Sequence, residues 1–489
     1  MTDHGETAAN QAHGTPHEAH STPHEALGAL SETLGARLYS AGYTEPRLRQ
    51  FWGGAVSDAL VRNNAAPAIH HCRKVFASGQ TLATGEPAAA ADLAAGADLA
   101  AIALLFHFHQ DVAAEVVRRA LGDEAFAAAV DAGLIELGED SSGDAGAVVT
   151  APCALTPYDL PVGVPRGFRP GDENLYLISD HGTLVDPDVL EGDFVLGLGG
   201  AGRTLVSLTP RDRVGLAADI GTGCGIQALL LARHADRVIA TDVSTRALRL
   251  AELSARLNGV DTIEFRSGSL LEPLSERVDL LVSNPPFVIT PRIASDQPNG
   301  PAVPDFEYRD GGMTGDALVR SLFTAIPEVL APGGRSVCLG NWELSDEDAA
   351  ASAGPETWVA DPDTSVLVIE REVLDLIAYA ETWIRDGGVT RASLQWNQAT
   401  AAWIDDFASR DVTGIVFGYV LMQRVEGQGI DNDFRTFADS ATCSSPVMPS
   451  TDATFKAKVR TTSAPANNAH GIGAFVQTIF ELRSWLQGV

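Results

Sequence analysis

A glycine-rich run follows an apolar stretch near the middle of the chain, where Asp219 to Gly225 reads Asp-Ile-Gly-Thr-Gly-Cys-Gly. Glycine has no Cβ, so Gly221, Gly223 and Gly225 allow the backbone to turn sharply and to approach a ligand closely. A turn of this kind leads from a strand into a helix, whose first N–H groups have no partner within the helix. The run therefore predicts a turn that binds a polar ligand at the end of a strand.

A second polar run ends another apolar stretch about sixty residues later, where Ser283 precedes Asn284, Pro285, Pro286 and Phe287. The prolines fix the backbone and leave its carbonyls outside helical hydrogen bonding. The Asn284 side-chain carbonyl and the Pro285 backbone carbonyl can then accept both N–H bonds of a planar amino group, on which Phe287 stacks. Such a nitrogen is a poor nucleophile because its lone pair is delocalised. By itself the run would indicate only a loop that ends a strand. After the glycine turn, it predicts a site that holds such a nitrogen in line with an electrophile and favours the charge that develops.

Alternating apolar strands and helices surround both runs, which is the pattern of a doubly wound α/β sheet. A helix over 244–258 is expected to begin at the Ser244 cap and to end before Gly259. Ligands of such sheets bind at the carboxyl ends of the strands, where both runs fall. Strands are expected near 214–220, 237–241, 262–267, 278–283, 335–341, 364–370 and 414–424, with a helical insertion around 373–410.

The two runs together resemble class I methyltransferases that use S-adenosylmethionine and methylate planar nitrogens. Asp242 ends the second expected strand, and the segments 306–316 and 331–334 are similar to release-factor glutamine methyltransferases. The resemblance covers about 190–345 well and reaches about 425 in outline. It implies a seven-stranded Rossmann-like methyltransferase sheet, S-adenosylmethionine as cofactor, and an enzyme whose favoured acceptor is a protein glutamine side chain.

On this resemblance, the donor needs backbone N–H groups, carboxylates and an apolar slot. Asp219 orders the turn or meets the ammonium end of the donor, and Asp242 stands where dinucleotide folds place the acid for ribose hydroxyls. Relatives commonly carry a carboxylate for the adenine amino group where this chain has Ser269, whose hydroxyl is a weaker acceptor. The expected cofactor-binding residues are Asp219, Gly221, Thr222, Gly223, Gly225, Asp242, Val243 and Ser269, and the expected catalytic residues are Asn284, Pro285, Pro286 and Phe287.

Other functions are weighed against this one. A hydride-transferring Rossmann enzyme is disfavoured because the turn lacks the Gly-x-Gly-x-x-Gly register and because such an enzyme has no use for Asn-Pro-Pro-Phe. An rRNA adenine-N6 or guanine-N2 methyltransferase stays open, since Phe287 is frequent in base methyltransferases whereas Tyr is more usual in the glutamine enzymes. A regulator that binds S-adenosylmethionine or DNA without turnover is the third hypothesis.

The charge of the chain favours a protein acceptor. Its 489 residues carry a formal net charge of -30, which repels polyanions, so a release-factor-like protein is favoured over rRNA. Neither a signal peptide nor an apolar run long enough for a bilayer is found, and a cytoplasmic location is expected. The five cysteines show no metal-like spacing, so neither a disulfide nor a metal site is expected.

Four segments are expected along the chain. They are a disordered His-rich tail (1–26), a mostly helical, winged-helix-like domain (27–160), the methyltransferase domain (172–426) and a C-terminal extension of unknown role (427–489). The helical domain lacks the Lys/Arg stripe of a DNA-recognition helix, so substrate docking is favoured for it over DNA binding.

Three more groups near the runs are candidates. The segment 197–204 either closes the methionine end of the donor or forms a plain flexible loop. The charged residues 307–310 either line the acceptor entrance or, as is more usual for charged residues, form a solvated loop. Asn341 and Trp342 end the fifth expected strand and are candidates to border the cleft.

Overall fold

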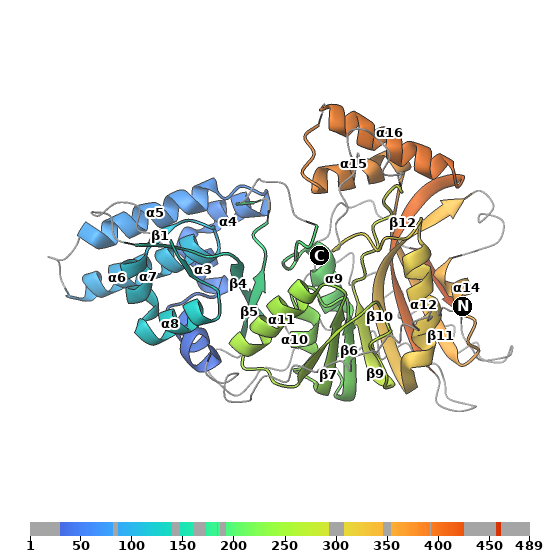
Figure 1. The fold of residues 1–489 in the computed structure, drawn as a ribbon, viewed down its shortest axis with the longest axis horizontal. Helices are drawn as coiled ribbons and strands as arrows, with labels where there is room; N and C mark the ends of the chain where they lie inside the picture. Colours follow the sequence, from blue (N-terminus) through green and yellow to red (C-terminus); the bar gives the residue numbers. More distant parts are fainter. Residues whose placement is uncertain are drawn as a thin grey trace, which may run out of the picture.

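The structure is a computed structural model that describes residues 30–81, 87–138, 147–160, 173–182, 184–185, 192–292, 308–345, 354–391, 393–424 and 456–460. A helical module lies on one side of the molecule and a large sheet with its covering helices on the other (Figure 1). The expected tail at 1–26 and most of the extension at 427–489 lie outside the described residues.

One eight-stranded sheet contains all seven expected strands. Its order is β13-β11-β12-β10-β9-β6-β7-β8; the strands from β10 to β8 run parallel, and β12 is antiparallel to both of its neighbours. The strands are β6 (Val214–Ile220), β7 (Ala235–Asp242), β8 (Ile263–Ser267), β9 (Val278–Ser283), β10 (Leu330–Ser345), β11 (Thr364–Leu374), β12 (Val412–Arg424) and β13 (Lys456–Arg460). The unexpected β13 comes from the extension and pairs antiparallel with β11.

The sheet reverses its strand order between β6 and β9. From β8 to β10 the strands follow the Rossmann-type order, in which the first and fourth strands are neighbours and their connections lie on opposite faces. Ligands of open α/β sheets bind in the crevice at this switch point. Both candidate runs follow these two strands.

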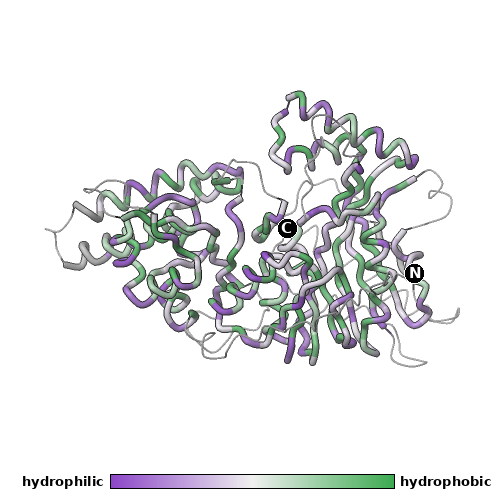
Figure 2. The backbone as a smooth tube through the Cα atoms, in the orientation of Figure 1, coloured by the Kyte–Doolittle hydropathy of each residue, from purple (hydrophilic) through white to green (hydrophobic). Residues whose placement is uncertain are grey.

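Helices cover both faces of the sheet (Figure 1). Leu280 and Val282 of β9 face the cluster that includes α9 (Gly200–Leu208) and α10 (Ile226–Leu231). Leu281 faces the opposite cluster, with α12 (Ala317–Val329) and α14 (Pro355–Trp358). Parallel strands covered on both faces are largely apolar, and in Figure 2 hydrophobic residues predominate at the centre of the sheet. The expected insertion forms α15 (Leu376–Asp386) and α16 (Leu394–Ala408), which lie between β11 and β12.

Helix α11 (Thr245–Leu257) connects the sheet to the helical module. As expected, it begins after Ser244, whose hydroxyl oxygen accepts a hydrogen bond from the Ala247 N–H at 3.3 Å. Its Ser254 and the adjoining Asn258 accept hydrogen bonds at 2.9 Å from backbone N–H groups of β5 (Asn174–Ser179). Apolar residues of α11 share one core cluster with the module, so the module packs directly on this helix.

The helical module combines helices with two small sheets. The first has the order β1-β3-β2 and the second pairs β4 with β5, whose sequences lie on either side of the expected domain boundary. The elements are the π-helical turn η1 (Ser31–Gly35), α2 (Ala36–Ser40), α3 (Glu45–Trp52), α4 (Gly54–Val61), α5 (Ala66–Thr81), α6 (Pro87–Phe106), β1 (Val112–Ala113), α7 (Ala114–Leu121), α8 (Asp123–Asp131), β2 (Glu136–Leu137), β3 (Val148–Thr150) and β4 (Ala154–Asp159). Among the described helices, none is both long and apolar enough to cross a membrane.

Candidate active site

The glycine turn and the Asn-Pro-Pro-Phe run lie side by side at the carboxyl edge of the sheet. Ile220 of β6 pairs with Ser283 of β9, and the Ser283 hydroxyl donates a hydrogen bond to the Ile220 carbonyl at 2.8 Å. A Cβ added to Gly221 would lie 3.9 Å from the backbone oxygen of Asn284. The fold therefore brings together two runs that are about sixty residues apart in the chain.

Glycine is required at the positions of this turn for different structural reasons. All three have positive φ, at 72° for Gly221, 54° for Gly223 and 85° for Gly225, a region that favours glycine. A Cβ on Gly225 would meet the Cβ of Ala251 in α11 at 2.9 Å, so this glycine permits close helix packing. A Cβ on Gly223 would have no described atom within 4 Å. Gly223 thus leaves open space beside the turn.

Asp219, near the end of β6, holds the glycine turn together from the buried side. Its side chain is buried, and one carboxylate oxygen accepts hydrogen bonds from the Thr222 hydroxyl at 2.6 Å and from the Ala228 N–H at 3.0 Å. Burial raises the pKa of Asp219 to about 7, although these two hydrogen bonds act in the opposite direction. Of the two roles expected for Asp219, this geometry favours ordering the turn.

Asp242 reaches the same turn from the end of β7. Its carboxylate accepts hydrogen bonds from the Gly223 N–H and from the Ser244 N–H, each at 2.9 Å. Burial raises the pKa of Asp242, and the backbone hydrogen bonds lower it. A carboxylate has about four acceptor positions, so both oxygens can accept further hydrogen bonds. The next residue, Val243, is 56% exposed and presents apolar surface beside this carboxylate.

Ser269 lies close to Asp242 at the neighbouring strand end. Ser267 of β8 pairs with Asp242, and the Gly268 N–H donates to the Asp242 carbonyl at 3.0 Å. Ser269 follows directly and is exposed. Asp242 therefore contacts the glycine turn on one side, with Val243 and Ser269 close to Asp242, while Asn284 lies on the other side of the turn.

The Asn-Pro-Pro-Phe run presents a buried acceptor. The Asn284 Oδ1 atom is buried and has no hydrogen-bond partner among the residues that the structure describes. Buried polar atoms normally have a partner, so an orphaned one needs an explanation. Pro285 is buried, and the half-buried Phe287 packs where three core clusters meet.

The loop that carries Arg309 and Asp310 is buried, and the prediction of a solvated loop was wrong for these two residues. Arg309 is 4% exposed and Asp310 is 7% exposed. Asp310 forms an ion pair with Arg292, and its backbone forms a bridge with Phe287. Arg309 donates to an Asp386 carboxylate oxygen of α15 at 3.0 Å. Burial is possible because these charges are paired, and the partner Asp386 lies far away in the sequence. Glu307 lies outside the described residues.

Tyr379 of α15 is a buried site residue that sequence reasoning missed. Its phenolic oxygen accepts hydrogen bonds from the Ile289 N–H at 3.0 Å and from the Asn341 side-chain amide at 3.1 Å. Asn341 and Trp342 are each 1% exposed, so they lie within the core behind the run and do not border an open cleft. No local sequence pattern marks Tyr379, because its partners come from distant segments.

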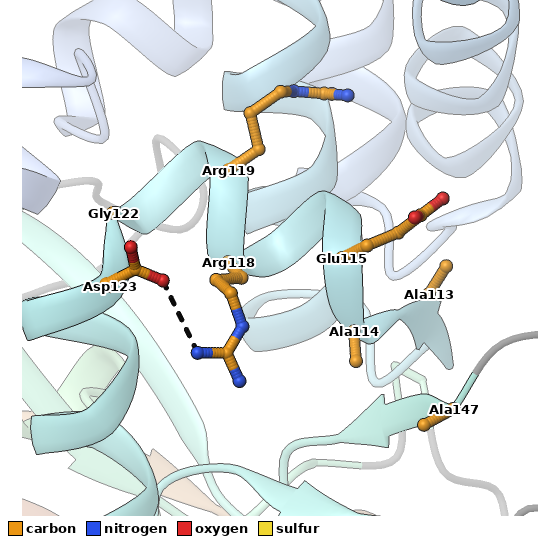
Figure 3. A pocket seen from close by; sticks show the side chains of 8 residues that line it. All are labelled: Ala113, Ala114, Glu115, Arg118, Arg119, Gly122, Asp123 and Ala147. Carbon is orange, nitrogen blue, oxygen red and sulfur yellow. Dashed lines mark hydrogen bonds and ion pairs between the residues drawn. The ribbon is translucent and has the colours of Figure 1, made fainter.

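The segment 197–204 is partly helical. Helix α9 begins at Gly200, and the Gly202 carbonyl accepts a hydrogen bond at 2.9 Å from the side chain of Gln227 in α10. A cavity of about 610 Å³ lies elsewhere, on the helical module between α7 and the start of α8 (Figure 3). Arg118 and Asp123, which form an ion pair at 3.4 Å, line it, and none of the expected site residues does.

Comparison with known proteins relates two parts of the chain to families. Residues 198–296 match the family model of the methyltransferase small domain, and residues 40–146 match a domain of unknown function, DUF7059. The match at 198–296 includes every expected cofactor-binding and catalytic residue, and S-adenosylmethionine is the cofactor expected from the sequence.

Similar curated proteins are glutamine methyltransferases. The ribosomal protein uL3 glutamine methyltransferase of Bradyrhizobium diazoefficiens is 34% identical over 183 residues, which is 34% of this chain and 56% of that protein. The release factor glutamine methyltransferase of Geobacter sulfurreducens is 41% identical over 123 residues, 24% of this chain and 42% of that protein. The chain thus spans about half the length of these relatives. A solved putative methyltransferase of Streptococcus mutans in complex with SAH is 13% identical, covers 47% of this chain and 100% of its own, and gives a TM-score of 0.26.

The residues of the methyltransferase domain fit this cofactor. Gly223 leaves open space at the turn, and the Asp242 carboxylate keeps acceptor capacity for hydroxyl groups. The exposed Val243 offers an apolar surface next to that carboxylate. Together they supply the close backbone approach, the acceptor and the apolar contact that the ribose and adenine parts require.

Proposed function

We propose that this chain is an S-adenosylmethionine-dependent N-methyltransferase that acts on a glutamine side chain of a protein. When bound, S-adenosylmethionine supplies a methyl group on a positively charged sulfur. Gly221 and Gly223 bring the backbone turn close to the ligand, and Asp219 keeps that turn in place through Thr222. Asp242, Val243 and Ser269 would hold the ribose and adenine parts.

The observation that carries this proposal is the orphaned Asn284 Oδ1. The atom is buried, lacks a partner among the described residues, and belongs to the residue directly after β9, the strand that pairs with β6 ahead of the glycine turn. Leaving a buried acceptor unsatisfied costs about 1–3 kcal/mol, which a ligand that donates a hydrogen bond recovers. A primary amide has two such N–H bonds, and the Pro285 carbonyl can accept the second.

These residues account for the reactivity of a poor nucleophile. Two acceptors fix both N–H bonds, so the nitrogen lone pair is aimed along one direction. As positive charge develops on the nitrogen, both hydrogen bonds strengthen. Phe287 would stack on the amide plane, and the acidified nitrogen then loses its proton to water without a strong base.

The choice of a protein acceptor is supported by charge and by similarity. Both relatives described above are named for glutamine methylation, one of a release factor and one of a ribosomal protein. The net charge of -30 opposes binding of rRNA. We infer that this enzyme methylates a protein of the translation apparatus and works in the cytoplasm.

We further propose that the helical module is a winged-helix-like unit that docks this substrate. In support of this, β1 precedes α7 and α8, β2 and β3 follow them, and the three strands pair in the order β1-β3-β2, which is the arrangement of a winged helix. Helix α8 stands in the place of a DNA-recognition helix, yet it carries Asp123, Glu124 and Asp131 and has neither Lys nor Arg. A protein surface is therefore a better partner for it than a phosphate backbone.

The test is a transfer assay with labelled S-adenosylmethionine and three acceptors: purified release factors, ribosomal protein uL3 and naked rRNA. Label in one glutamine of a protein acceptor, located by mass spectrometry of peptides, is the expected result. Label in RNA alone would contradict the glutamine assignment, and label in none of the three would contradict the acceptor class.

A further inference from the structure

We propose that α15 is the scaffold of the acceptor site and that Tyr379 is a positioning residue for the Asn284–Phe287 run. The inference rests on the proposed function, since it concerns how the same site holds its nitrogen. It assigns a role to the insertion between β11 and β12, which the family model at 198–296 does not include.

Tyr379 fixes the backbone just after the run. Its side chain is fully buried, with ring centroids 5.6 Å from those of Trp403 and Phe417. Its oxygen accepts hydrogen bonds from the Ile289 N–H at 3.0 Å and from the Asn341 amide at 3.1 Å. Ile289 lies two residues beyond Phe287, so the phenol is a fixed anchor for the end of the run.

Helix α15 also fixes the segment 308–310, which pairs with the residues around Phe287. Asp386 at the end of α15 accepts hydrogen bonds from the Tyr308 hydroxyl at 2.9 Å and from the Arg309 guanidinium at 3.0 Å. Arg309 also donates to the Trp383 carbonyl at 3.0 Å.

The two segments are joined to each other directly. The Val288 N–H donates to the Arg309 carbonyl at 2.8 Å, next to the backbone bridge between Phe287 and Asp310. Helix α15 therefore holds both of the paired segments, the one that follows Phe287 and the one at 308–310. In Figure 1, α15 lies with α16 at the end of the sheet where the runs emerge.

Loss of the Tyr379 phenol oxygen should displace the Asn284–Phe287 run without removing any of its residues. Tyr379→Phe leaves the Ile289 N–H and the Asn341 amide without their acceptor inside a closed core. A displacement of about 1 Å at a reacting group can cost on the order of 100-fold in rate. The hydrogen bonds that hold the glycine turn come from Asp219 and Asp242 and involve no atom of α15.

The test compares Tyr379→Phe with Tyr43→Phe. Tyr43 is equally buried, but its hydroxyl donates to the Leu155 carbonyl at 2.7 Å in the helical module. We expect Tyr379→Phe to lower kcat about 10- to 100-fold, with the KM for S-adenosylmethionine within about twofold of wild type. Tyr43→Phe should leave both parameters near wild type. A kcat for Tyr379→Phe within twofold of Tyr43→Phe would overturn the proposal.

A second pair of variants, at the surface of α15, tests the scaffold role without disturbing the core. Asp386→Asn weakens the contacts to Tyr308 and Arg309, while Glu381→Gln removes only an exposed ion pair with Arg391 at 2.7 Å. The first should lower kcat by several-fold and the second should not; equal kcat values in these two variants would contradict the scaffold role.

Hydrogen exchange separates failure of this inference from failure of the proposed function. The Ile289 amide should exchange at least about tenfold faster in Tyr379→Phe than in wild type or Tyr43→Phe, whatever the acceptor is. Unchanged exchange would refute the anchor. Wild-type enzyme that labels no glutamine but labels RNA would refute the glutamine assignment, and the kcat comparison would then be made on RNA.

Discussion

The contact between Gly225 and Ala251 gives a quantitative test of the glycine turn. Gly225 has a φ of 85°, and Gly225→Ala forces an L-residue into this left-handed region at a cost of about 1–2 kcal/mol. The new Cβ would also lie 2.9 Å from the Ala251 Cβ and 3.2 Å from its Cα, a backbone atom that cannot rotate away. Overpacking of this kind costs about 1–3 kcal/mol. We therefore expect a loss of about 2–5 kcal/mol in the free energy of unfolding.

A double-mutant cycle isolates the steric part. Ala251→Gly removes the opposing Cβ and costs about 1 kcal/mol as a glycine within α11. In the double variant the Cβ–Cβ clash disappears but the approach to the Ala251 Cα at 3.2 Å stays, so the two changes should couple favourably by about 1–2 kcal/mol, less than the full overpacking cost. Urea unfolding of wild type, both single variants and the double variant measures this coupling. A coupling below about 0.5 kcal/mol would refute the argument that close packing on α11 requires Gly225.

Gly223 provides the matched contrast within the same turn. Its φ is 54°, but an added Cβ would have no described atom within 4 Å. Gly223→Ala should therefore lose only the conformational part, about 1–2 kcal/mol. Because the open side of Gly223 is where the ligand is expected, this variant should lose S-adenosylmethionine affinity out of proportion to its stability.

Two further predictions concern Asp219 and Ser269, two polar residues expected at the S-adenosylmethionine site. Burial raises the pKa of Asp219 from 3.8 to about 7, so between these values the folded protein keeps a proton that the unfolded chain releases. Its contribution to stability is full below the lower value and falls as pH rises through the window, by at most about 1.4 kcal/mol per pH unit. Asp219→Asn keeps an oxygen acceptor for Thr222 and Ala228, so urea unfolding across this window should show a flatter pH profile; parallel profiles would contradict the buried proton. Ser269→Asp supplies the carboxylate that the family resemblance leads us to expect at this position and should tighten S-adenosylmethionine binding about tenfold by calorimetry, whereas unchanged or weaker binding would place Ser269 away from adenine.

The central sheet and the glycine turn after β6 were predictable because their signals are local. Apolar runs such as 214–220 and 278–283 each form a strand at the expected place, since a strand buried on both faces is apolar throughout. Ser244 and Gly259 marked the ends of α11 for a similar reason, because capping depends on one or two residues.

The acceptor side depends on long-range contacts, which a sequence pattern does not display. Arg309 and Asp310 have the composition of a solvated loop, and only Asp386 and Arg292, brought in by the fold, allow them to be buried. Tyr379 is one tyrosine among the aromatic residues of α15 until β9 and β10 place Ile289 and Asn341 next to it.

The unexpected strand β13 shows the same limit at the edge of the sheet. Its sequence, Lys-Ala-Lys-Val-Arg, lies in a polar segment and carries three charges in five residues. Edge strands tolerate such charges because one side has no partner strand. The pairing of β13 with β11 is therefore a property of the assembled sheet and not of a local apolar pattern.

The most direct test of the account is methyl transfer by Asn284→Ala, measured with the protein acceptor and labelled S-adenosylmethionine. Without Oδ1, one of the two acceptors that hold the nitrogen is lost, and kcat should fall about 100- to 1,000-fold, the usual cost of one preorganised hydrogen bond to developing charge. The Kd for S-adenosylmethionine should stay within about threefold, because the hydrogen bonds of the donor turn come from Asp219 and Asp242. Transfer within tenfold of wild type would contradict the claim that Asn284 holds the reacting nitrogen.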